Sequence, residues 1–389
     1  MNLSAIQSAL SERNLDAWLF YDHHHRDPIA YRVLGLPENL MVTRRWFYLI
    51  PAKGEPRKLV HKIEAGHLDS LPGDKRSYAA WQELADGLKH LLASCRDIAM
   101  QYSPNNGIFT ISLVDGGTLE LVRSLGKNVV SSGDLVALFE ATLSEAQIES
   151  HFAAGKAIDQ ITAQAFEEIG RRARTSGGAS EFQIQQWILE AFRRENLAAA
   201  DPPVVAVNRN SGDPHYGPSS TKSEPIREGD FVLLDIWGKK NQPDAVYYDI
   251  TWTGSVGKAP SDRVLEAFRV VRDARDAGAR FVRESIAAGK TIAGYQVDQA
   301  VRDRIQLAGL GSQFVHRTGH SIGTEIHANG ANMDNLEIHD ERRIIPNSLF
   351  SIEPGVYFPD FGVRSEINVL VRSQGAEVTG RMQNDVVII

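Results

Sequence analysis

The sequence has a single cysteine, no long apolar run and no excess of positive charge. Because Cys95 stands alone, no disulfide can form within the chain, and we expect a protein of the reducing cytoplasm. No stretch of about 18 apolar residues occurs, so no membrane span is expected, and residues 1–6 do not resemble the start of a signal peptide. Lys and Arg number 42 against 49 Asp and Glu, and this net charge of −7 argues against a nucleic-acid surface.

What is present is the composition of a globular protein, with 42% hydrophobic and 23% charged residues. A chain of 389 residues exceeds one ordinary hydrophobic core, and we expect two domains, residues 1–143 and 144–389. The boundary is placed at Ser144, where the sequence Ser-Glu-Ala-Gln147 has the spacing of a capping box that opens a long helix.

The two parts differ in their pattern of predicted elements. The first alternates short apolar runs typical of strands (17–21, 46–50, 58–61 and 97–101) with a helical pattern over 81–94, which favours an α/β domain. The second begins with helices over 145–173 and from 180 onward, and continues with strands near 231–236 and 247–253. Helices near 261–286 and 295–307 follow before a strand-rich end, so we expect an α+β domain.

Four carboxylates and one imidazole stand out in this second part because of their surroundings. Asp235 closes an apolar run, Asp249 lies within a strand pattern, and Glu353 stands between Ile352 and Pro354. Taken singly, such residues are more often turn formers or members of surface ion pairs than functional groups. Carboxylates gathered in one pocket repel each other unless cations neutralise them, and two divalent ions would balance four negative charges. The sequence therefore predicts a dinuclear metal site in a hydrolase, with these ligands: Asp235, Asp249, His320, Glu353 and Glu366.

In order and local context these five residues resemble the metal ligands of the pita-bread metallopeptidases. That family includes methionine aminopeptidase, aminopeptidase P, prolidase and the related creatinase. The segments that carry the resemblance are 234–235, 249–251, 316–327, 352–357 and 362–366, and residues 1–140 resemble the creatinase-type N-terminal domain. Two departures occur: 13 residues separate Asp235 from Asp249, more than is usual, and Trp252 stands where arginine is common. The extra residues are expected in a hairpin-like loop over 238–244, which leaves Asp249, rather than Asp244, as the second aspartate.

The resemblance implies a role for each residue. Asp249 and Glu366 would bridge two ions, Asp235 would hold one of them, and His320 with Glu353 the other. Glu353 would also transfer the proton. The resemblance further implies that His316 and His327 steady the oxyanion, that His215 lies near the leaving amine, and that Arg364 and Tyr357 bind substrate. Manganese is the expected metal, and cobalt, zinc or iron also suit these ligands.

The resemblance leaves several activities open. Cleavage of Xaa-Pro bonds is the leading hypothesis, by a dipeptidase (prolidase) or by an aminopeptidase P that acts on longer peptides. A non-peptide amidohydrolase like creatinase or ectoine hydrolase is an alternative, and so is a non-catalytic binding protein of the same fold. The expected partners are a small peptide substrate and a second copy of the chain in a homodimer.

Overall fold

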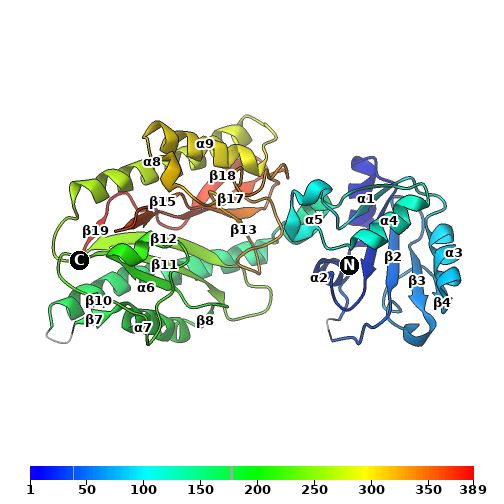
Figure 1. The fold of residues 1–389 in the computed structure, drawn as a ribbon, viewed down its shortest axis with the longest axis horizontal. Helices are drawn as coiled ribbons and strands as arrows, with labels where there is room; N and C mark the ends of the chain where they lie inside the picture. Colours follow the sequence, from blue (N-terminus) through cyan, green and yellow to red (C-terminus); the bar gives the residue numbers. More distant parts are fainter. Residues whose placement is uncertain (38, 176–177) are drawn as a thin grey trace. The chain divides into compact units, whose positions relative to one another are not determined.

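The computed structural model describes residues 1–37, 39–175 and 178–389, and it divides into two compact units, Met1–Glu140 and Ala141–Ile389. Each unit has its own hydrophobic core and is described by itself (Figure 1). In the described part of the chain, no helix has the length and apolarity needed to cross a bilayer.

The first unit is built on a six-stranded sheet with the order β4-β3-β2-β1-β5-β6. Its strands are β1 (Ala17–Asp22), β2 (Trp46–Pro51), β3 (Arg57–His61), β4 (Asp74–Tyr78), β5 (Asp97–Met100) and β6 (Asn128–Ser131). Its helices are α1 (Leu3–Glu12), α2 (Pro28–Leu34), α3 (Trp81–Leu91), α4 (Gly116–Ser124) and α5 (Gly133–Glu140).

Side chains that alternate along β1 enter two separate cores, because successive residues of a strand point to opposite faces. Trp18 and Phe20 pack with residues of α1, α2 and α5, whereas Leu19 and Tyr21 pack with residues of α3 and α4. Helices therefore cover both faces of the sheet, and the predicted α/β class of this part is confirmed.

The second unit begins with two helices on one face of a sheet. Ser144 and Gln147 form the predicted capping box at the start of α6 (Glu145–Ala173), and Ser180 and Gln183 form another at α7 (Glu181–Arg194). The sheet has the order β19-β12-β11-β8, with β9 also paired to β11. Its strands are β8 (Leu197–Ala198), β9 (Val204–Val207), β11 (Phe231–Lys240), β12 (Tyr248–Ser255) and β19 (Val387–Ile388), and β7 (Ala179–Ser180) pairs with β10 (Pro225–Ile226) apart from it.

The remaining elements of this unit form a second layer of sheet covered by two helices. Helices α8 (Asp262–Ala287) and α9 (Gly294–Leu307) lie on the opposite side of the sheets from α6 and α7 (Figure 1). The strands of this layer are β13 (Ser321–Ile322), β14 (Leu349–Ile352), β17 (Ile367–Arg372) and β18 (Gly375–Thr379), and β15 (Gly355–Tyr357) and β16 (Gly362–Arg364) form a hairpin. Helices cover both outer sides of the strands, in agreement with the α+β class that the sequence predicts for this unit.

Strand β12 meets the second layer through the side chain of Asn368. Its Oδ1 accepts from the backbone N–H of Asp249 at 3.2 Å, and its Nδ2 donates to the Asp249 carbonyl at 2.6 Å. The backbone N–H of Glu366 donates to the carbonyl of Thr251 at 3.2 Å. Residues 249–251 are thereby fixed beside residues 366–368, although more than a hundred residues separate them in sequence.

The extra residues between the two aspartates lie in the turn that joins β11 to β12. Strand β11 continues to Lys240, further than the sequence pattern indicates, and the turn spans 241–247. Asp244 is exposed there with a φ of 58°, whereas Asp249 is buried within β12. Residues 231–238 pair with 248–255 in unbroken register, so the pairing of the two strands is regular beside this long turn.

Candidate metal centre

Three of the predicted ligands form a compact buried group. One ligand atom each of Asp249, His320 and Glu366 lies within 4.8 Å of the others. Asp249 comes from β12, His320 directly precedes β13, and Glu366 lies between β16 and β17. The turn before His320 requires Gly319, because a Cβ there would lie 2.0 Å from the carbonyl oxygen of Ser351.

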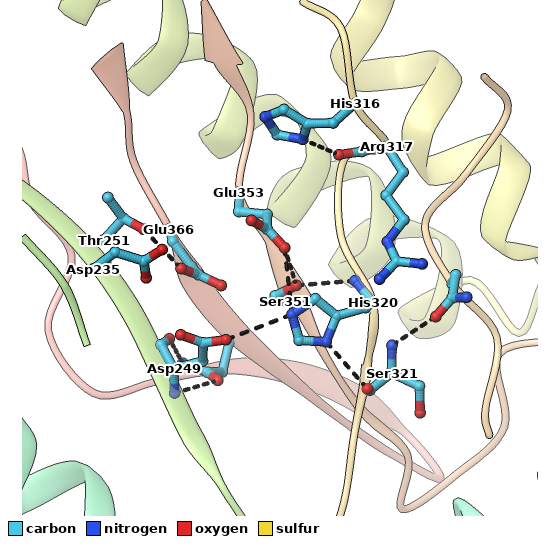
Figure 2. Close-up of polar contacts among 12 residues, drawn as sticks. Asp235, Asp249, Thr251, His316, Arg317, His320, Ser321, Ser351, Glu353 and Glu366 are labelled. Atoms are coloured by element: carbon cyan, nitrogen blue, oxygen red, sulfur yellow. Dashed lines mark hydrogen bonds and ion pairs between the residues drawn. The ribbon is translucent and has the colours of Figure 1, made fainter. Parts of the chain in front are cut away.

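The other two predicted ligands lie beside this group. Glu353 follows β14, and its Oε1 is 3.4 Å from His320 Nε2 and accepts from Ser351 Oγ at 3.0 Å. Asp235 lies on β11 directly opposite Thr251 of β12, and its charge acts on both Asp249 and Glu366. Figure 2 shows the four carboxylates and the imidazole of His320 facing one another. The structure thus brings together all five residues that the sequence singled out.

The group has an excess of negative charge that nothing nearby fully balances. Burial raises the pKa of Asp249 and of Glu366 well above the usual range, and the neighbouring carboxylates raise it further. Asp249 Oδ1 and Glu366 Oε1 are buried and accept no hydrogen bond within the described part of the chain. Two unpaired carboxylate oxygens in one buried group are costly unless a cation binds them.

The tautomer of His320 strengthens this argument. Its Nδ1 lies 3.2 Å from the carbonyl oxygen of Ser321, which can only accept, so Nδ1 carries the proton. The lone pair of Nε2 then faces Asp249 Oδ2 at 3.5 Å and Glu353 Oε1 at 3.4 Å. A lone pair directed at carboxylates is repulsive, and a cation between them makes the arrangement favourable. A backbone acceptor behind a metal-binding histidine is also the usual way to fix its ring. The residues present therefore fit divalent metal ions.

The guanidinium of Arg364, which the resemblance assigns to substrate binding, contacts three side chains of the protein itself. Its Nη2 donates to Asp235 Oδ2 at 2.5 Å, its Nη1 to Tyr357 Oη at 2.8 Å, and its Nε to Thr251 Oγ1 at 3.2 Å. The residue is only 5% exposed, so its guanidinium is directed into the protein. Arg364 thus donates to both Asp235 and the Thr251 hydroxyl, and Thr251 in turn donates to Glu366 Oε2 at 2.9 Å.

His316 and Tyr357 continue this hydrogen-bond chain. His316 Nδ1 lies 2.7 Å from the Arg317 carbonyl and must donate to it, so Nε2 accepts from Tyr357 Oη at 2.8 Å. Burial lowers the pKa of His316 to about 3 and raises that of Tyr357 to about 12, so both groups are neutral near pH 7. With both ring nitrogens engaged, His316 has no free N–H for an oxyanion, in contrast to the role expected from the sequence.

The remaining predicted residues lie at different distances from the centre. His327 packs edge-on against His320 with ring centroids 4.4 Å apart, and partial burial together with His320 lowers its pKa to about 4. His215 is exposed in the loop after β9, where its backbone N–H donates to Asp213 Oδ1. Its role near a leaving amine stays a prediction.

Sequence reasoning missed Thr251, Ser351 and Asn368, whose side chains hold the predicted ligands. Alternation could have found all three, since Thr251, Ser351 and Asn368 each lie two residues from a predicted ligand. It also missed Arg317, whose charge acts on His316, His320 and His327. Figure 2 shows its side chain extending alongside His320, and the guanidinium has no hydrogen bond or ion pair to the described residues.

Comparison with known proteins decides the family. The model of metallopeptidase family M24 matches residues 153–373, which include all five predicted ligands. The chain belongs to metallopeptidase family M24. The resemblance to pita-bread metallopeptidases is thereby confirmed, and the chain is an enzyme of the metallopeptidase class.

Individual M24 relatives resemble the chain over different lengths. The probable dipeptidase PepE of Mycobacterium tuberculosis is 30% identical over 272 residues, 70% of this chain and 67% of that protein. A putative Xaa-Pro aminopeptidase of Mycoplasma pneumoniae is 35% identical over 198 residues, 50% of this chain and 51% of the relative.

Solved structures of the family match both units. The dipeptidase PepE from Mycobacterium ulcerans has a TM-score of 0.71 at 25% identity, covering 100% of this chain and 96% of that one. The prolidase from Thermococcus sibiricus has a TM-score of 0.65 at 20% identity over 100% and 98% of the two chains, a likeness of fold. The predicted fold class, with a creatinase-like α/β part and a pita-bread part, is confirmed.

Proposed function

We propose that this M24 enzyme is a dinuclear metal-dependent exopeptidase that cleaves Xaa-Pro bonds and acts as an Xaa-Pro dipeptidase. The observation that carries the proposal is the buried group of four carboxylates with the unprotonated Nε2 of His320 directed at two of them. The substrate class is taken from relatives that are named dipeptidases, Xaa-Pro dipeptidases or Xaa-Pro aminopeptidases.

In this proposal the five residues divide between two ions. Asp249 and Glu366 would contribute to both ions, Asp235 would hold one of them, and His320 with Glu353 would hold the other. When bound, the ions supply an activated water and polarise the scissile carbonyl. Manganese is the proposed metal, and the oxygen-rich donor set also suits cobalt, iron or zinc.

The protein's own groups move the proton and keep the ligands in place. Glu353 is only partly buried, is steadied by Ser351 Oγ, and lies beside His320, so it is placed to take a proton from the attacking water. It then returns that proton to the leaving nitrogen. Arg364 holds Asp235 in one orientation through a charge-assisted hydrogen bond. The ring of His327 lies against that of His320. Both ring nitrogens of His316 are hydrogen-bonded within the protein, so we assign the oxyanion contact to His327.

Arg317 replaces Arg364 as the proposed receptor of the substrate's free carboxylate. A guanidinium binds a carboxylate through two parallel hydrogen bonds, and that of Arg317 has no partner among the described residues. A cation at this place favours a dipeptide, whose carboxylate lies one residue beyond the scissile bond, over a longer peptide. A homodimer in the cytoplasm is part of the same proposal.

The test is hydrolysis of Ala-Pro beside Ala-Pro-Ala by the manganese-loaded protein. We expect cleavage of Ala-Pro and its loss in Glu353→Gln, while Glu341→Gln, at an exposed glutamate, serves as the matched control and retains activity. Preferred cleavage of Ala-Pro-Ala would make the enzyme an aminopeptidase P. Absence of cleavage of both peptides would refute the Xaa-Pro assignment.

A further inference from the structure

A cavity of about 390 Å³ lies behind the strand that carries Asp249. Successive side chains of β12 point to opposite faces, so Asp249 and Thr251 face the metal centre while Ile250 and Trp252 line the cavity. One side of the cavity is a face of α6 and the other is the segment 387–389. In Figure 1 α6 runs along the sheet that contains β12, with β19 at its edge.

Two side chains of this cavity, Trp252 and Arg381, carry hydrogen-bond donors without an acceptor among the described residues. Trp252 Nε1 is buried and has no hydrogen-bond partner among the described residues. An unpaired buried N–H is destabilising, so an acceptor supplied from outside the chain would be favoured here. The guanidinium of Arg381 lies over the Trp252 indole, 5.4 Å from the ring centroid.

The nearby carboxylate of Asp159 does not satisfy these donors. Its Oδ1 accepts from Tyr248 Oη at 2.8 Å, and its Oδ2 accepts from the backbone N–H of Arg381 at 3.2 Å. The Arg381 side chain forms no ion pair with the described residues. An indole N–H and a guanidinium side by side, with the local carboxylate already engaged, favour an anionic ligand group.

The rest of the lining is mostly apolar, and its exceptions are Thr162 and the charged Glu167 and Arg174. Phe166 and Ile250 form part of the wall, and Val387 and Ile388 lie across from α6. Glu167 is exposed at the same cavity. The volume lies in the range of small-molecule sites, and the apolar walls suit a branched hydrocarbon rather than a phosphate or sulfate.

We propose that this cavity is a second ligand site, which binds a small carboxylate with a branched apolar body. The carboxylate accepts from Trp252 Nε1 and pairs with Arg381, and the hydrocarbon packs on Phe166 and Ile250. A free amino acid of this shape gains Glu167 as a partner for its ammonium group. Trp252 is one of the two departures from the family pattern, and the proposed peptidase chemistry does not use its side chain.

A ligand in this cavity can affect turnover, because Trp252 and Asp249 lie three residues apart on the same strand. Their side chains point to opposite faces of that strand. A ligand bound there occupies the other side of β12 from the peptide and does not compete with it. Saturating ligand should therefore change kcat and leave KM for the peptide nearly constant. The inference does not depend on which peptide bond is cleaved.

The experiment is calorimetric titration of the manganese-loaded full chain with 4-methylpentanoate and with L-leucine. We expect saturable binding, weakened roughly 10-fold in Trp252→Phe, which removes only the N–H, and in the exposed Arg381→Gln. Arg372→Gln, at an arginine outside the cavity, is the matched control and should bind like the wild type. Equal binding of both compounds identifies a simple carboxylate site, and tighter binding of leucine, lost in Glu167→Gln, identifies an amino-acid site.

Three results would overturn the inference. These are no saturable binding of either compound, affinity that is the same in Trp252→Phe and Arg381→Gln as in the wild type, and purely competitive inhibition with unchanged kcat. The second would place the ligand outside this cavity, and the third would locate it at the metal centre. Calorimetry decides the question even if the chain cleaves no Xaa-Pro peptide, so failure of the proposed function is distinguishable from failure of this site.

Discussion

Arg364 Nη2 donates to Asp235 Oδ2 at 2.5 Å, and this contact joins β16 to β11 behind the metal centre. Both side chains are largely buried, with 6% and 15% of their surfaces exposed. The arginine therefore acts on the metal site through its ligand rather than through the substrate.

Arg364→Lys should weaken metal binding. A lysine keeps the charge but cannot hold Asp235, Tyr357 and Thr251 at once, so the carboxylate loses its fixed orientation. Loss of such an outer contact typically costs about 10–100-fold in metal affinity or activity. Competition with a chelating dye measures the manganese affinity, and Arg263→Lys, in an exposed ion pair, is the control. Equal affinity in wild type and Arg364→Lys would show that the contact does not support the site.

Arg317→Gln should separate dipeptides from their amides. If Arg317 binds the free carboxylate, KM for Ala-Pro rises by about 10-fold or more, as expected for loss of a hydrogen-bonded charge pair. KM for Ala-Pro-amide, which has no carboxylate, should change little. Steady-state kinetics on both substrates checks this. A similar rise in KM for the amide would show that Arg317 does not bind the carboxylate and instead supports the structure of the site.

Glu366→Gln should stabilise the metal-free protein while abolishing its activity. Removing one of several buried negative charges relieves the repulsion that raises the pKa of Asp249 and Glu366, and the amide retains the contact to Thr251. We expect a gain of about 1–2 kcal/mol in the free energy of unfolding without metal. Urea unfolding with and without manganese measures it, and manganese should stabilise the wild type more than the variant. A variant less stable than the metal-free wild type would contradict the repulsion.

The five proposed ligands could be named because their order and local context resemble those of a known family, and because each is a polar residue in a setting that does not otherwise suit it. The strands and helices of the first unit could be predicted from alternation, and the capping boxes fixed the starts of α6 and α7. The partners of Arg364 could not, because Asp235 lies 129 residues away and only the pairing of distant strands brings them together. The tautomer of His316, in which Nε2 accepts a hydrogen bond, likewise depends on the direction of the Arg317 carbonyl. No residue pattern reveals that direction. Sheet order in the first unit is long-range information of the same kind.

His151 should make the second unit sensitive to mild acid. Its Nδ1 donates to the Tyr247 carbonyl, its Nε2 accepts from Thr379 Oγ1, and burial lowers its pKa to about 4 from 6.5. The unfolded chain therefore takes up the proton first as pH falls. The stability due to neutral His151 is complete above pH 6.5 and is lost as pH falls toward 4, by roughly 3 kcal/mol in all.

Urea unfolding of the metal-free protein at pH 7 and pH 5 tests this sensitivity. Metal is left out so that release of the ions does not add to the pH dependence. The wild type should lose about 2 kcal/mol more than His151→Gln between these two values. Glutamine can keep both hydrogen bonds without titrating. The same loss in both proteins would show that His151 does not determine the acid response.

The most direct test of the account is the number of metal ions bound per chain. Equilibrium dialysis against manganese, followed by elemental analysis, should give two ions per wild-type chain, with peptidase activity rising as they bind. Glu366→Gln, which lacks a proposed shared ligand, should bind fewer than two. A wild-type protein that binds one ion or none, or that is fully active with one, would contradict a dinuclear centre built from Asp235, Asp249, His320, Glu353 and Glu366.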